Sequence, residues 1–294
     1  MQFLSKSLWH DRVRRQIFPP DCSRRDCRST RRIWRRTPMI LVEGRWVCSP
    51  QCLEASAVGL MEHFFASRRP PAAQHRMPLG LLMLSRGYIN EEQLQRVLAV
   101  QLAAGQGRLG SWAVKSQFVS ERQLLTALSQ QWSCPVLALQ GPPDLGCSEM
   151  LPWCLLRALR MMPVRFVEST RLLYVAVCDP LQHASLAAIE HMLHCQVVPC
   201  LVSDRTMDGW LANESQWRAL YVQVFEKTSG AAEIARIMTS YASRLGAGNV
   251  HIVRCGPYVW VRFDIDARTA DLLFRIDPVP LGDRGAYEVV AAAG

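Results

Sequence analysis

The chain has 294 residues, of which 49% are hydrophobic and 20% charged, a balance typical of a folded protein of about two domains. No segment near the start is apolar enough for a secretory signal peptide, and no run of about 18 uncharged apolar residues predicts a transmembrane helix. The net charge of +9 is uneven, since residues 1–40 carry +8 and the remainder +1. This basic segment favours contact with nucleic acid or lipid headgroups, although a solvated arm has the same composition.

Two pairs of cysteines mark the first 60 residues. Cys22 and Cys27 have four residues between them, and Cys48 and Cys52 have three. Eleven cysteines without a signal peptide indicate a reducing compartment and argue against a disulfide framework. Four thiolates suit the tetrahedral shell of Zn²⁺, and we expect these four to hold a structural zinc ion. The alternative is four unlinked thiols in a disordered arm.

Arginines surround the four cysteines and keep nucleic-acid binding open. They are Arg24, Arg25, Arg28, Arg31, Arg32, Arg35 and Arg36. Short strands are expected at 39–42 and 45–48, and a helix at 54–67. The Ser-Pro-Gln that follows Cys48 is a second possible helix start, which would bring Cys52 onto that helix. The sequence RRPPAAQHR after the helix has the composition of a linker.

The next segment contains an internal repeat with an offset of 30 residues. Identical residues recur at Leu79, Gly80, Glu91, Gln93, Leu94, Leu98 and Gln101, and again at Leu109, Gly110, Glu121, Gln123, Leu124, Leu128 and Gln131. Each copy contains a capping box, beginning at Asn90 in the first and at Ser120 in the second, so a helix should start at the same place in both. A shorter helix should precede each of these. We predict two helix pairs, related by duplication, that pack on one another.

From about residue 134 the pattern changes to alternating strands and helices. Strands are expected near 134–139, 162–169, 172–179 and 195–203, and helices near 150–159, 181–193 and 204–215, which make a small α/β domain. A connection near 217–228 leads to a helix at 231–248 and strands at 249–254 and 258–266, a second α/β unit.

The repeat resembles the MshE N-terminal-type module at the front of type II secretion and type IV pilus assembly ATPases. That family's duplicated motif has the form R-L-G-x-x-L-V-x-x-G-x-I-x-x-x-x-L-x-x-A-L-x-x-Q, and here the copies are PLGLLMLSRGYINEEQLQRVLAVQ and RLGSWAVKSQFVSERQLLTALSQQ. Together with RLGAGNVHI and VRFDID, which resemble the start of the motor's second domain, the similarity covers about 77–275 in family order.

In the resembling module the duplicated motif binds cyclic di-GMP. The resemblance implies contacts from the opening Arg, the Leu-Gly pair, two inward leucines and the closing Gln. They correspond here to Leu79, Gly80, Leu94, Leu98 and Gln101 in copy one, and to Arg108, Leu109, Gly110, Leu124, Leu128 and Gln131 in copy two. The sequence departs from the motif twice, with Pro78 in place of the Arg and Gln117 in place of a Gly.

The catalytic features of the motor family are missing from the sequence. A phosphate-binding loop needs Gly-Lys followed by Ser or Thr, and the chain contains no Gly-Lys dipeptide. We interpret His251, Asp264 and Asp266 as strand residues of the scaffold rather than catalytic groups. We therefore expect no enzymatic activity.

The sequence thus predicts a multi-domain α+β fold. Its parts are a small, basic, zinc-ribbon-like head at 1–60, a linker at 61–76, the duplicated helical module with its α/β unit at 77–216, and a partial second α/β domain at 217–294. The expected function is that of an adaptor or regulator that acts on a component of the secretion or pilus machinery. The expected location is the cytoplasm, with peripheral attachment to the inner face of the membrane as an alternative. The rivals are a zinc-finger nucleic-acid binder that uses the module for association, and a decayed or truncated ATPase.

Overall fold

The computed structural model describes residues 22–27, 40–66, 76–137, 143–147, 150–178, 181–212, 222–228, 230–266 and 268–276. It divides into two compact units. Unit 1 combines the described residues up to Ala66 with those from Val222 onward, and unit 2 lies between them in the sequence. The architecture is mixed α+β, with one sheet in each unit, as the sequence predicts. Arg28, Arg31, Arg32, Arg35 and Arg36 lie outside the described residues, as does most of the expected linker.

Unit 1 is built on a six-stranded sheet with the strand order β2-β1-β7-β8-β9-β6. Its strands are β1 (Ile40–Val42), β2 (Arg45–Val47), β6 (Val222–Phe225), β7 (Asn249–Cys255), β8 (Tyr258–Ile265) and β9 (Arg268–Arg275). The strands β1–β2, β7–β8 and β8–β9 pair antiparallel, whereas β1–β7 and β6–β9 pair parallel. The hairpin from the start of the chain therefore extends the edge of the later sheet.

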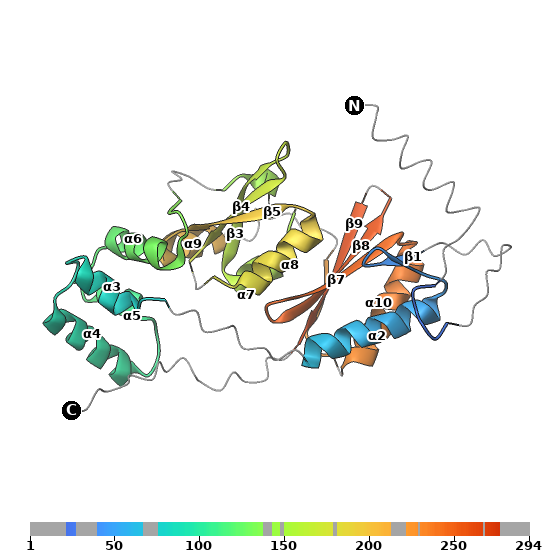
Figure 1. The fold of residues 1–294 in the computed structure, drawn as a ribbon, viewed down its shortest axis with the longest axis horizontal. Helices are drawn as coiled ribbons and strands as arrows, with labels where there is room; N and C mark the ends of the chain where they lie inside the picture. Colours follow the sequence, from blue (N-terminus) through green and yellow to red (C-terminus); the bar gives the residue numbers. More distant parts are fainter. Residues whose placement is uncertain are drawn as a thin grey trace. The chain divides into compact units, whose positions relative to one another are not determined.

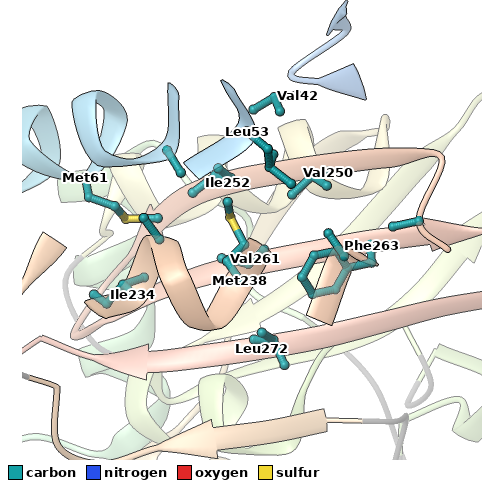
Figure 2. Packing of buried hydrophobic residues seen from close by; sticks show 14 of the residues in the cluster. Val42, Leu53, Met61, Ile234, Met238, Val250, Ile252, Val261, Phe263 and Leu272 are labelled. Atoms are coloured by element: carbon teal, nitrogen blue, oxygen red, sulfur yellow. The ribbon is translucent and has the colours of Figure 1, made fainter. Parts of the chain in front are cut away.

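Two helices cover one face of this sheet, α2 (Pro50–Ala66) and α10 (Ala231–Leu245) (Figure 1). Leu53 and Met61 of α2, and Ile234 and Met238 of α10, are fully buried. They pack with alternate residues of the strands, among them Ile252 of β7, in one apolar cluster (Figure 2). The apolar face of α2 therefore belongs to the same core as the later strands.

This arrangement differs from the sequence-based division into a head at 1–60 and a separate domain at 217–294. The backbone N–H of Leu41 donates to the carbonyl of Gly248 at 3.0 Å, and the N–H of Glu43 donates to the carbonyl of Val250 at 3.0 Å. The physical reason is that β1 and β2 have three residues each, too few to form a stable sheet alone. The expected connection at 217–228 also contains the edge strand β6.

Unit 2 begins with four helices, two from each copy of the repeat. They are α3 (Leu79–Ser85), α4 (Glu91–Ala104), α5 (Leu109–Lys115) and α6 (Glu121–Trp132). The two predicted capping boxes are both present, at Asn90 with Gln93 and at Ser120 with Gln123. The predicted helix pairs and their starting points are therefore confirmed.

The rest of unit 2 is a three-stranded sheet with helices. Its elements are the 3-10 turn η1 (Leu145–Cys147), α7 (Trp153–Leu159), β3 (Met161–Val167), β4 (Leu172–Val177), α8 (His183–Leu193), β5 (Gln196–Leu201) and α9 (Asp204–Leu211). The strands β3 and β4 pair antiparallel, and β4 and β5 pair parallel across α8. The strand expected near 134–139 amounts, within the described residues, to one bridge between Val136 and Leu201.

Candidate ligand site and candidate metal centre

The core of the duplicated helices consists of equivalent residues from the two copies. Its buried members form three pairs at the 30-residue offset, Met83 with Ala113, Ile89 with Val119, and Val97 with Ala127. The partly buried residues around them also form pairs, for example Leu79 with Leu109 and Leu94 with Leu124. Each copy therefore supplies half of one shared core, so that neither helix pair buries its apolar face alone.

The two Leu-Gly pairs face each other at the centre of this module. A Cβ added to Gly80 would lie 2.9 Å from Leu94 Cδ1 and 3.2 Å from Leu109 Cδ2. The equivalent atom on Gly110 would lie 2.6 Å from Leu124 Cδ1 and 3.4 Å from Leu79 Cδ2. The glycines thus allow leucines of both copies to approach the backbone of α3 and α5. The arrangement is reciprocal, since each glycine is approached by one leucine of its own copy and one of the other copy.

The closing glutamines cross between the copies in the same reciprocal way. Gln101 Nε2 donates to the carbonyl of Gly107 at 2.8 Å, and Gln131 Nε2 donates to the carbonyl of Met77 at 2.8 Å. Each of these carbonyls lies one residue before the motif of the other copy. The two copies are therefore related by an approximate two-fold axis. The structure brings together the two Leu-Gly pairs, Leu94 with Leu124, and the two closing glutamines.

The two copies differ most at Leu98 and at the start of the motif. Leu98 is 43% exposed, whereas its counterpart Leu128 is half-buried. Leu98, expected as the second inward leucine of copy one, is therefore at the surface, next to the buried Val97. At the motif start, Pro78 precedes α3 with φ −55° and ψ 138°, and Arg108 precedes α5 with φ −95° and ψ 143°. The backbone is extended at both places.

Arg108 contacts residues that the sequence did not indicate. Its Nη1 donates to the carbonyl of Cys178 at 2.9 Å, and its Nη2 lies 2.5 Å from Asp204 Oδ1 at the start of α9. Both partners belong to the sheet-containing part of unit 2. No local pattern could have identified them, since Asp204 is 96 residues away from Arg108.

The four paired cysteines come together in unit 1. One ligand atom from each of Cys22, Cys27, Cys48 and Cys52 lies within 4.8 Å of all the others. The Sγ atom of Cys27 is 3.4 Å from that of Cys48 and 3.7 Å from that of Cys52, and the sulfurs of Cys48 and Cys52 are 3.5 Å apart. Four thiolates at a Zn–S distance of about 2.3 Å are about 3.8 Å apart in a tetrahedron. The donor set therefore fits a tetrahedral metal ion, whereas a disulfide needs about 2 Å.

Local backbone structure fixes these four sulfurs. The loop 22–27 is attached to β2 because Ser23 N donates to the carbonyl of Trp46 at 2.9 Å. The Ser49 hydroxyl accepts from Cys52 N at 3.2 Å and so caps α2, in which Pro50 occupies the first helical position. The expected helix start at Ser-Pro-Gln is thus confirmed. Burial and the neighbouring thiols raise the pKa of Cys48 to about 12.

His251 and Asp264 lie side by side in unit 1, on paired strands. His251 Nε2 is 3.3 Å from Asp264 Oδ2, and its Nδ1 is 3.9 Å from Glu43 Oε2 in the turn between β1 and β2. Asp264 and then Glu43 raise the pKa of His251 to about 9, although burial opposes this. A charged imidazole between two carboxylates joins the hairpin to β7, and we interpret it as a structural contact. Sequence analysis did not indicate Glu43.

Similarity to known proteins is found among solved structures. No protein-family model and no curated protein matches the chain. Among solved structures, MshE with cdg is 28% identical with a TM-score of 0.41, covering 49% of this chain and 100% of that one. The N-terminal domain of XpsE is 17% identical with a TM-score of 0.35, covering 48% and 94%, and in a second crystal form it is 18% identical with a TM-score of 0.29, covering 46% and 91%.

Each of these solved structures matches over about half of this chain. Within the described ranges, no helix is long and apolar enough to cross a membrane.

Proposed function

We propose that this chain is a non-catalytic adaptor or regulator of type II secretion or type IV pilus machinery, and that its duplicated helices bind cyclic di-GMP. The observation that carries the proposal is the reciprocal arrangement of the two motif copies. Each closing Gln bonds to the carbonyl that precedes the other copy's motif. Because cyclic di-GMP has two identical halves, a site made from two equivalent motifs suits its symmetry.

Residues of both copies supply the chemistry that such a ligand requires. The guanidinium of Arg108 can pair with a phosphate or with a guanine edge. The exposed side chain of Leu98 offers apolar surface to a base, and Gly80 and Gly110 let the motif leucines pack close to the backbone of α3 and α5. Pro78 provides no charge, so copy one would hold its half of the ligand mainly through apolar contacts.

The chain's own sequence supports a non-catalytic role. The motor family's mechanism needs a Lys on the phosphates, and no Gly-Lys dipeptide is present. The proposal implies a cytoplasmic location and a partner in the secretion or pilus machinery. The four cysteines would hold one structural Zn²⁺ that fastens the loop 22–27 and β2 to the start of α2.

Calorimetric titration with cyclic di-GMP tests this proposal. We expect the full chain to bind, and Arg108→Ala to abolish binding, because copy one has no Arg to compensate for the lost charge. Pro78→Arg should tighten binding by about tenfold, which is the change in affinity that corresponds to the free energy of one charge-assisted hydrogen bond. The extended backbone at Pro78 resembles that at Arg108, so the fold should accept the substitution. If neither the wild type nor Pro78→Arg binds, the repeat is only a packing scaffold.

The alternative hypothesis, nucleic-acid binding by the arginines around the four cysteines, is supported by only two described arginines. Arg24 and Arg25 are exposed in the loop between Cys22 and Cys27, whereas the remaining arginines of the basic segment lie outside the described residues. DNA affinity that falls steeply with salt would favour this rival.

A further inference from the structure

Both terminal nitrogens of Arg108 are engaged by groups of the same chain. Nη1 donates to the carbonyl of Cys178 and Nη2 to the carboxylate of Asp204. A phosphate that binds Arg in the usual bidentate manner uses two parallel N–H groups of the guanidinium. The guanidinium carries five N–H donors, and an anionic ligand that approaches them competes with the Asp204 carboxylate for the same positive charge.

Asp204 is the charged member of this pair of contacts, and its neighbours show what would follow if it were neutralised. Asp204 Oδ1 also lies 3.3 Å from Arg160 Nη2, and Asp208, one helical turn along α9, lies 2.7 Å from Arg160 Nη1. Arg160 therefore keeps a carboxylate partner when Asp204 is changed. The principal effect of neutralising Asp204 falls on Arg108.

We infer that Asp204 is an internal competitor for Arg108, and that it sets the affinity of the duplicated helices for an anionic ligand. This inference rests on the proposed function, because it concerns the same ligand site. Copy one contains Pro78 where copy two contains Arg108, so the competition acts on the one motif arginine that the chain has. Asp204 is a positioning residue, which acts on the ligand through Arg108.

The pair is half exposed, which fixes the size of the effect. The side chains of Arg108 and Asp204 retain 41% and 39% of their exposure. An ion pair this open to water changes an equilibrium by about twofold to fivefold. Asp204 therefore lowers the affinity without abolishing it. By linkage, a ligand that takes Arg108 weakens the contact between α5 and α9 by the same factor.

Calorimetric titration of the full chain with cyclic di-GMP, in low salt, separates the possibilities. Asp204→Asn is nearly isosteric and should bind about twofold to fivefold more tightly than the wild type. Asp208→Asn is the matched control, because it removes the same charge from the same helix without touching Arg108, and its affinity should equal that of the wild type. Asp204→Glu, which keeps the charge, should behave like the wild type. Thermal melting of each variant verifies that it is folded.

The outcomes distinguish this inference from the proposed function. Tighter binding by Asp204→Asn but not by Asp208→Asn supports both, even if the wild type itself binds too weakly to measure. Equal binding by the wild type and Asp204→Asn overturns the competition and leaves the ligand site intact. Absence of binding by every variant, including Asp204→Asn, overturns both. Hydrogen exchange adds a second readout, since cyclic di-GMP should speed exchange in α9 of the wild type and have no such effect in Asp204→Asn.

Discussion

Gln117 ends the second short helix in a conformation that favours glycine. Its φ is 58°, close to the 66° of Gly87 at the equivalent place in copy one. Its backbone N–H donates to the carbonyl of Val114 at 2.9 Å, so the left-handed turn is part of the helix end. The departure from the family motif at Gln117 therefore has a conformational cost, because a side chain is strained in this region.

Replacement of Gln117 by Gly should stabilise the protein. We expect the free energy of unfolding to rise by about 0.5–1 kcal/mol, since the relief of strain exceeds the extra entropy of glycine in the unfolded chain. Urea denaturation of Gln117→Gly measures this change. Ser116→Gly is the control, because Ser116 has φ −75° and gains nothing from glycine. A loss of stability in both variants would contradict the argument.

At the scale of elements, the four-cysteine cluster joins three pieces of backbone. Cys22 and Cys27 lie in a loop, Cys48 follows β2, and Cys52 lies in the first turn of α2. A metal ion there would hold the loop 22–27 against the hairpin. Among the described residues, one backbone hydrogen bond, from Ser23 N to the carbonyl of Trp46, already joins the loop to the hairpin, and a second, from Cys27 N to the carbonyl of Arg24, closes the turn within the loop.

We predict one equivalent of Zn²⁺ per chain in the purified full-length protein. Cys48→Ser should lower the zinc content to near zero, because a hydroxyl does not replace the thiolate of a Cys₄ site. It should also raise protease sensitivity in the loop 22–27. Cys255→Ser is the matched control, since Cys255 is buried in β7 and is not among these ligands. Elemental analysis gives the metal content, and full zinc occupancy in Cys48→Ser would exclude this site.

The contact of the β1–β2 turn with β7 should make stability depend on pH. The pKa of His251 is raised from 6.5 to about 9, so its contribution is complete below pH 6.5 and is lost as the pH rises through 9. The loss should be about 1–3 kcal/mol, reduced from the full shift because Asp264 is partly exposed. Urea denaturation between pH 6 and 9.5 measures it. His251→Gln should show a weaker dependence, and the difference between the two proteins removes the effect of thiol titration. Parallel curves for both would refute this assignment.

At the scale of the whole molecule, the sequence predicted local features and missed distant partners. The capping boxes at Asn90 and Ser120 were readable because all their bonds lie within four residues. The cysteine pairs were readable because ligand spacing is local as well. In contrast, Glu43 accepts a hydrogen bond from Ile252 N, 209 residues away, and nothing in either segment specifies the other. The edge strand β6 was missed for the same reason, since four residues show little periodicity.

Unit 1 is discontinuous in sequence, because unit 2 lies between its two halves. Neither half can form the core alone. Leu53, Ala57 and Met61 of α2 are completely buried, as are Ile234 and Met238 of α10, and all five belong to one cluster. Each buried Leu, Ile or Met contributes about 1.5–3 kcal/mol through removal from water. Loss of α2 would therefore expose the apolar faces of α10 and of the sheet.

Removal of residues 1–66 should unfold unit 1 and leave unit 2 folded. We expect residues 222–276 to lose protection against proteolysis and hydrogen exchange. The reason is that their core loses α2, and that β7 loses its pairing with β1. Residues 76–212 should keep their protection, since the helical core and the three-stranded sheet of unit 2 are formed from residues within that range. Met61→Ala in the full chain is the milder variant, and it should cost about 2–5 kcal/mol in the unfolding of unit 1 alone. Limited proteolysis with mass spectrometry identifies the protected ranges. Retained protection of residues 222–276 in the truncated chain would mean that the late strands and α10 form a core without the hairpin and α2, as the division at residue 217 predicts.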